Sequence, residues 1–202
     1  RQQPAQAMSE ALTSESPPDA DIEAMKRLAE GDDLALNGIM HRWKDKVAAF
    51  LYRMTGSSEA ATDLAQETFV RLYQSRARYQ PTAAFPTYLF RIASNLGRNH
   101  ARWRTRHPTV SVEDCTTTLQ QLPGHDTSPD EAAEQHETAL RVEKAIASLP
   151  ADLREALHLF TDEEMSQHDI AQALGCTVKA VETRIYRARQ MLKEMLDDLR
   201  PR

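Results

Sequence analysis

The sequence predicts an all-α protein of two small helical domains joined by a flexible linker. Apolar residues recur at steps of three and four on both sides of a central stretch, and no segment of useful length alternates like a β-strand. The central stretch, residues 107–128, has no such period and holds Pro, Gly, Thr and Asp. We therefore expect a disordered tail over residues 1–20, a first domain over 21–106, the linker over 107–128, and a second domain over 129–200.

The first domain is expected to hold three helices. Apolar positions over residues 34–54 mark one face of an amphipathic helix. A second helix follows and stops at Gln80-Pro81, because the residue before a proline disfavours helical geometry. Thr82 is expected to cap a third helix that runs towards Trp103 and buries Phe90.

The second domain is expected to hold four helices with recognisable start and stop signals. Ser128 precedes the first of them, which stops at Leu149-Pro150. Ser166 can cap a short helix that Gly175 ends, and Thr177 can cap the long helix that follows. A short helix, a glycine turn and a long helix form the pattern of a DNA-binding helix-turn-helix.

Charge along the chain supports contact with nucleic acid. The net charge is -5, but residues 21–110 carry 14 Lys/Arg against 9 Asp/Glu, and residues 111–137 carry 7 acids without any Lys or Arg. From Cys176 to Lys193 there are 5 basic residues and 1 acid, where arginines could contact guanine or phosphate. The alternative for this helix is an ordinary solvated face.

Enzymatic and membrane functions find little support in the sequence. We see no nucleophile–base arrangement, no phosphate-cradling glycine-rich loop and no His/Cys metal spacing, so we expect no catalytic residues, no metal and no cofactor. Cys115 and Cys176 are far apart, as in a reduced cytoplasmic chain. No apolar run approaches the roughly 18 residues that span a bilayer, and residues 1–19 do not resemble a secretory signal, so no membrane insertion is expected.

Three segments resemble the extracytoplasmic-function (ECF, group 4) sigma factors of RNA polymerase, in the sigma-70 family. Residues 149–196 (LPADLREALHLF to LKEML) resemble their promoter-reading C-terminal domain. DLAQETFVRLY at residues 63–73 resembles their polymerase-binding helix, and AFPTYLFRIASNLGRNHARWRTR at residues 84–106 is similar to their promoter-melting segment. The resemblance implies an alternative sigma factor that binds core polymerase and directs promoter-specific initiation.

The resemblance also implies three binding surfaces. Residues that would dock on the clamp helices of the polymerase β′ subunit are Asp63, Gln66, Glu67 and Arg71. Residues that would bind the −10 element are Tyr88, Asn95, Arg98, Asn99, Arg102 and Arg104. Residues that would bind the −35 element are Thr177, Lys179, Thr183, Arg184, Tyr186 and Arg187. Asn95 would bond a flipped-out base in a pocket shaped by residues 79–85.

The implied partners are core RNA polymerase, through its β′ clamp helices and β flap, promoter DNA, and an anti-sigma factor. Two residues depart from the family pattern. Pro86 stands where a helix-friendly or aromatic residue is expected, and Glu182 stands where relatives often have a basic residue. The competing hypothesis is a helix-turn-helix regulator that binds DNA without polymerase, usually as a homodimer.

Overall fold

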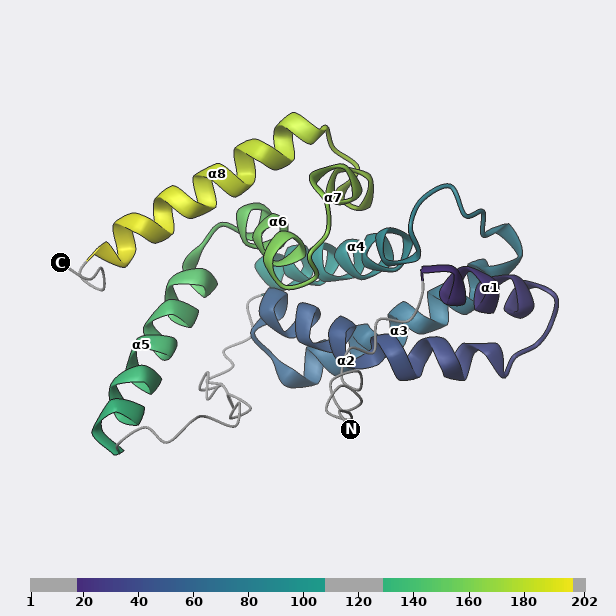
Figure 1. Cartoon of the computed structure of the whole chain (residues 1–202), viewed down its shortest axis with the longest axis horizontal. Helices are drawn as coiled ribbons and strands as arrows, with labels where there is room; N and C mark the ends of the chain where they lie inside the picture. Colours follow the sequence, from purple (N-terminus) through teal and green to yellow (C-terminus); the bar gives the residue numbers. More distant parts are fainter. Residues whose placement is uncertain (1–17, 108–128, 198–202) are drawn as a thin grey trace, which may run out of the picture.

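The computed structural model describes residues 18–107 and 129–197, and within these ranges the regular structure is entirely helical. The α-helices and the single 3-10 helix, η1, follow one another as α1 (Pro18–Ala29), α2 (Ala35–Thr55), α3 (Ser58–Ser75), η1 (Arg76–Arg78), α4 (Phe85–Arg106), α5 (Pro129–Ser148), α6 (Ala151–Thr161), α7 (Gln167–Leu174) and α8 (Val178–Met195). Figure 1 shows α1–α4 as one group, with α6 and α7 lying over α4 and α5 extending away. The all-α fold class is confirmed.

The predicted start and stop signals of α7 and the predicted start of α8 are confirmed, whereas the predicted cap Ser128 lies outside the described residues. The Ser166 side chain accepts a hydrogen bond from the backbone of Asp169, and the Thr177 side chain accepts one from Ala180. Gly175 follows α7 with φ of 64°, the left-handed conformation that glycine adopts without strain. These caps hold α7 and α8 in the expected helix-turn-helix arrangement.

Two expectations for the first domain are wrong. Helix α1 begins at Pro18, so residues 18–20 are helical although the sequence placed them in the tail. Thr82 does not cap the third helix, because α4 begins at Phe85 and Ala84 occupies the capping position without a side-chain hydrogen bond. Residues 81–84 therefore remain a short non-helical connection to α4.

Helix α1 is held by a buried carboxylate that the sequence does not distinguish from a surface one. Asp21, which is 4% exposed, accepts hydrogen bonds from Arg42 Nε at 2.8 Å and from Trp43 Nε1 at 2.9 Å. Met25 and Leu28 on the same helix are fully buried. An ion pair and an apolar stripe thus fix α1 on α2.

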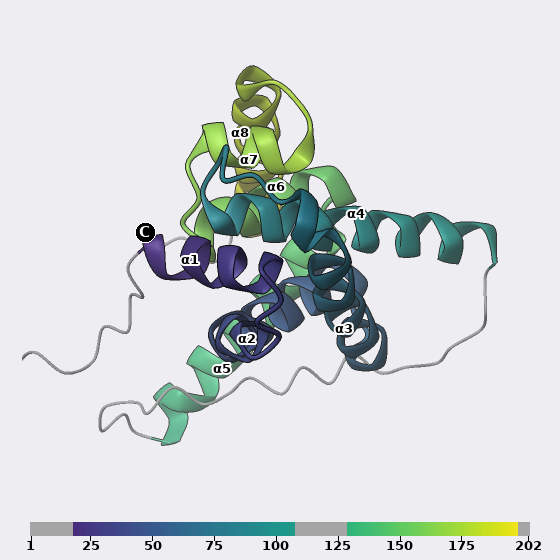
Figure 2. The same cartoon turned by 90° about the vertical axis from the view of Figure 1, so that its right-hand side faces the viewer.

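The main hydrophobic core draws on both halves of the chain. Phe50 and Phe90 meet edge to face at 5.3 Å between ring centroids, and Phe90 is fully buried as expected. Leu159 and Ile170 from α6 and α7 belong to the same cluster. Figures 1 and 2 both show α6 and α7 against α4, so the two halves pack as one body within the described residues.

The expected linker lies outside the described residues apart from His107, and the domain boundaries stay a prediction. Within residues 18–107 and 129–197, no helix combines the length and apolar character needed to cross a bilayer. Cys115 also lies outside the described residues, whereas Cys176 is a half-buried free thiol in the turn between α7 and α8.

Candidate nucleic-acid interface

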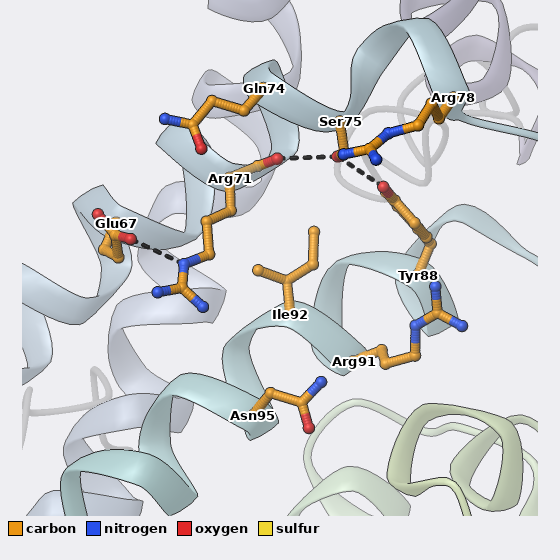
Figure 3. A pocket seen from close by; sticks show the side chains of 9 residues that line it. All are labelled: Glu67, Arg71, Gln74, Ser75, Arg78, Tyr88, Arg91, Ile92 and Asn95. Carbon is orange, nitrogen blue, oxygen red and sulfur yellow. Dashed lines mark hydrogen bonds and ion pairs between the residues drawn. The ribbon is translucent and has the colours of Figure 1, made fainter.

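One face of α4 borders an open polar pocket with a volume of about 460 Å³ (Figure 3). Tyr88, Arg91, Ile92 and Asn95 fall at steps of three and four, which places them on one side of the helix. The end of α3 and η1 form the opposite wall. The lining residues are Glu67, Arg71, Gln74, Ser75, Arg78, Tyr88, Arg91, Ile92 and Asn95.

Hydrogen bonds join the α3 and α4 walls of the pocket. The Tyr88 hydroxyl donates to Ser75 Oγ at 2.6 Å, and the Ser75 hydroxyl donates to the Arg71 carbonyl at 2.8 Å (Figure 3). The Tyr79 ring contacts the Tyr88 ring edge to face at 5.0 Å, and burial raises the pKa of Tyr79. Tyr79 therefore contacts a residue that lines the pocket, and the expected shaping of the pocket by residues 79–85 stays a prediction.

Asn95 lies at the rim of this pocket on the exposed side of α4 (Figure 3). An amide offers two N–H donors and one carbonyl acceptor, which suits the polar edge of a base. The neighbouring Arg91 and Arg78 add positive charge to the same cavity. The pocket can thus bring base-edge hydrogen bonds and phosphate neutralisation together.

Of the residues expected to bind polymerase, two are exposed on α3 and two lie on the pocket wall. Asp63 and Gln66 are exposed on α3, away from the pocket. Glu67 and Arg71 form an ion pair at 2.7 Å on the pocket wall (Figure 3). The expected polymerase surface and the expected −10 surface therefore adjoin along α3.

The C-terminal end of α4 is basic and exposed. Figure 2 shows this end projecting beyond the other helices, and residues 101–107 are all exposed. Arg104 Nη1 donates to the Thr55 carbonyl at 3.0 Å, whereas Asn99 and Arg102 lie open to solvent. These side chains are placed where a nucleic-acid strand could follow the helix.

Arg98, in contrast to the exposed basic residues of α4, contacts the second half of the chain. Its Nε donates to both carboxylate oxygens of Glu155 on α6, at 2.9 and 3.1 Å. The Arg98 side chain is 29% exposed and that of Glu155 only 2%. Burial raises the pKa of the Glu155 carboxyl, an effect that the positive charge of Arg98 opposes. The structure thus turns Arg98 towards the second half of the chain.

Helix α8 presents a polar face at its N-terminal end. Thr177, Lys179, Tyr186 and Arg187 are exposed, and Tyr186 retains 64% of its accessible surface. Lys179 pairs with Glu182 at 2.9 Å, so the unusual acid on this helix has a basic neighbour. This face has the exposure that a recognition helix requires.

Two of the residues expected to bind the −35 element already make contacts within the chain. The Thr183 hydroxyl donates to the Lys179 carbonyl at 2.8 Å. Arg184 Nε lies 3.6 Å from Asp152 on α6, and the Arg184 side chain is 27% exposed. Arg184 Nη1 also lies 3.7 Å from Cys176 Sγ, so the guanidinium contacts the turn before α8 as well as α6.

Sequence reasoning missed several lining residues of the pocket. Arg91 could have been found, because it lies one helical turn before Asn95 on a helix without acids. Gln74 and Arg78 carry no comparable signal, since they reach the pocket through the packing of α3 against α4. Among residues 18–107 and 129–197, no group of three or more His, Cys, Asp or Glu side chains could hold a metal ion.

These features define a helical protein with two candidate nucleic-acid surfaces, a polar pocket on α3–α4 and a helix-turn-helix on α7–α8. Residues 39–107 match the family model of sigma-70 region 2, and residues 139–192 match that of sigma-70 region 4. The chain is 32% identical over 187 residues to RNA polymerase sigma-H factor of Pseudomonas aeruginosa, covering 89% of this chain and 95% of the relative. It is also 32% identical over 187 residues to the ECF RNA polymerase sigma-E factor of Haemophilus influenzae, covering 89% and 96%.

Solved structures agree with this assignment. The structure of CnrH in complex with the cytosolic domain of CnrY matches with a TM-score of 0.66 and 28% identity, covering 89% of this chain and 99% of CnrH. The sigma factor RpoE of Bartonella quintana, solved with the anti-sigma factor NepR, shares the fold with a TM-score of 0.62 at 24% identity, covering 80% and 96%. The chain belongs to the ECF family of RNA polymerase sigma factors.

Proposed function

We propose that this sigma factor directs core RNA polymerase to promoters with separate −10 and −35 elements, read by the α3–α4 pocket and by α8. The observation that carries the proposal is the position of Asn95 at the rim of an open, arginine-bordered pocket. Such a site suits an unpaired base, which is read through its polar edges while arginine neutralises the strand.

The −10 residues have three proposed roles. Asn95 hydrogen-bonds the flipped-out base, and Tyr88 forms the end of its pocket. The strand backbone is held by Arg98, Asn99, Arg102 and Arg104. Support for these roles comes from the exposure of Asn99 and Arg102 beside the projecting end of α4.

The −35 element is proposed to contact the exposed face of α8. Lys179, Tyr186 and Arg187 are directly accessible there, together with Thr177 at the helix start. Thr183 and Arg184 lie deeper on the same helix and would complete the contact. The support is the confirmed helix-turn-helix arrangement, in which an exposed second helix enters the major groove.

Contacts with proteins are proposed on two further surfaces. Asp63, Gln66, Glu67 and Arg71 on α3 would dock on the β′ clamp helices, and the second domain would meet the β flap. An anti-sigma factor is proposed to control the chain in the cytoplasm. Support comes from the Bartonella quintana relative, which was solved with such a factor.

The test is in vitro transcription with purified core polymerase on a genomic promoter library, with and without this chain. We expect new start sites preceded by one shared two-part element. Absence of initiation, together with sequence-specific DNA binding by the chain alone, would favour a helix-turn-helix regulator that acts without polymerase.

A further inference from the structure

Glu155 is the one acid among the largest fully buried side chains of the described residues, with 1% of its surface exposed. It lies on α6, between hydrophobic neighbours that face the core, and none of the proposed contacts with polymerase or DNA uses it. A carboxylate in such a place needs a partner that offsets its lost hydration. Arg98 on α4 supplies two hydrogen bonds to it, at 2.9 and 3.1 Å.

The other donors of the same arginine also face the second half of the chain or are buried. Arg98 Nη1 approaches the Leu174 carbonyl at 3.5 Å, so the guanidinium is directed into the second half of the chain. A guanidinium recognises carboxylate and phosphate through the same planar set of N–H donors. Arg98 Nη2 is buried without a hydrogen-bond partner, so a DNA phosphate cannot reach it while Nε holds Glu155 in this arrangement.

Other polar contacts join the two halves beside this ion pair. The Thr87 hydroxyl on α4 donates to Asp169 Oδ1 on α7 at 3.2 Å. Arg154 Nη2 on α6 donates to the Met54 carbonyl at 3.2 Å, so a side chain of α6 is tied to the backbone of α2 as well. These contacts fix the position of Glu155 over Arg98, and the pair belongs to a defined interface.

We propose that Glu155 acts as an internal substitute for a DNA phosphate, keeping Arg98 engaged while α6 and α7 pack on α2 and α4 and releasing it when the two halves separate. The proposal rests on the proposed function, since it takes Arg98 to be a contact of the promoter strand. It adds a closed state in which one of the strand-holding residues is occupied by the chain itself.

The ion pair between Glu155 and Arg98 can break when the two halves separate. Burial raises the pKa of the Glu155 carboxyl despite the nearby Arg98, which means that ionised Glu155 is disfavoured in the closed state. Separation of α6 from α4 would return both groups to water and remove that cost. The ion pair thus fixes which surfaces meet, while the hydrophobic contacts supply most of the attraction.

The experiment measures the distance between fluorescent labels on the two halves of the full-length chain. Labels would be attached to cysteines introduced at the exposed positions Asn37 and Gln190, after Cys115 and Cys176 are changed to serine. Glu155→Lys, Arg98→Glu and the double exchange Arg98→Glu with Glu155→Lys are compared with the parent. Helical circular dichroism checks that each variant folds.

Each single variant places like charges together and is expected to raise the open fraction roughly tenfold, and the exchange should restore the parent distance, as for coupled neighbours. Glu194→Lys makes the same charge change at an exposed position of α8 and should leave the distance unchanged. If Glu155→Lys fails to fold, Arg98→Glu carries the test, because Arg98 is partly exposed already. Parent-like distances in both single variants, or no recovery in the exchange, would overturn the proposal.

A second measurement separates this proposal from the proposed function. A single-stranded −10 oligonucleotide is titrated into the polymerase-free chain, and Glu155→Lys should bind it more tightly than Glu194→Lys does. Opening without tighter binding would support the contact as a closure device and overturn the assignment of Arg98 to the DNA strand.

Discussion

Helix α4 has two neighbouring faces that meet different surroundings. The face with Tyr88 and Asn95 borders an open pocket, whereas the face with Thr87 and Arg98 packs against α6 and α7. Both faces carry polar side chains, so polarity alone does not decide which one remains accessible. The difference lies in whether another part of the chain satisfies those polar groups.

This difference separates two tasks within one helix. The proposed base-reading residue, Asn95, is accessible while the chain is closed. The proposed strand-holding residue, Arg98, is engaged by Glu155 until the halves separate. A closed chain can therefore present its specificity pocket without the full set of phosphate contacts that gives affinity for DNA.

The largest effect is expected on the face of α4 that borders the pocket. Asn95→Ala should lower the rate of promoter opening by about 10- to 100-fold, because a good side-chain contact with a base contributes about 1–3 kcal/mol. Affinity for core polymerase should stay near that of the parent. Both quantities can be followed with a fluorescent base in the −10 element and by competition for core enzyme.

The matched control for this variant is Asn37→Ala, which removes the same side chain from an exposed position on α2. It should leave promoter opening unchanged. If Asn95→Ala lost polymerase binding instead of opening, the pocket would belong to the polymerase interface and the assignment of Asn95 would be wrong.

The next largest effect concerns α8, where Arg184 contacts α6 while Tyr186 and Arg187 are exposed. Arg184→Ala should weaken protection of the −35 element in footprinting by about tenfold, as expected for a lost arginine contact with a base. Asp152→Ala, which only removes the neighbour of Arg184, should not weaken it. Unchanged footprints for Arg184→Ala would remove this residue from the −35 surface.

A smaller effect is expected on the packed face. Thr87→Val keeps the shape of the side chain but removes the donor to Asp169, and should lower the free energy of unfolding by about 1 kcal/mol. Thr62→Val is the control, since the Thr62 hydroxyl bonds only a carbonyl of its own helix, that of Ser58. Urea unfolding would measure both, and equal losses would mean that the contact with Asp169 adds nothing.

The sequence predicted the features of this fold that depend on nearby residues. Periodic apolar positions marked α2 to α4, and the side chains of Ser166 and Thr177 begin α7 and α8 as expected. Thr82 failed as a signal because α4 begins at Phe85 instead, with Pro86 in its first turn, where a missing N–H costs least. Helix α1 was missed because its support comes from Arg42 and Trp43 on another helix.

The candidate sites show the same limit. Asn95 lies at the rim of a pocket and Tyr186 is exposed on α8, and the assignment of both residues to promoter DNA stays a prediction. Glu155 gave no signal, because its partner Arg98 is 57 residues away and no local pattern connects them. Contacts between distant segments follow from tertiary packing, which hydrophobic periodicity does not encode.

The smallest expected effect concerns pH and bears directly on the packed face. Burial raises the pKa of the Glu155 carboxyl above its ordinary value of 4.5 in the closed chain, with Arg98 opposing the shift. Since the closed state then binds the proton more tightly than a solvated state does, lowering the pH towards 4.5 should favour closure. The gain builds up as pH falls through the raised pKa and is complete below the ordinary one.

The titration of Asp162 is expected to disfavour closure in acid, so its contribution must be separated from that of Glu155. Burial raises its pKa, but the hydrogen bond with His158 and the charge of Arg53 lower it overall, so acid weakens that contact. The label distance should therefore be compared between the parent and Glu155→Gln, which keeps Asp162 and differs only in the titrating carboxyl. We expect the closed fraction of the parent to rise as the pH falls, and to rise more than that of Glu155→Gln, because the Glu155 carboxylate is desolvated at the interface. Parallel pH profiles would mean that water still reaches Glu155 in the closed chain.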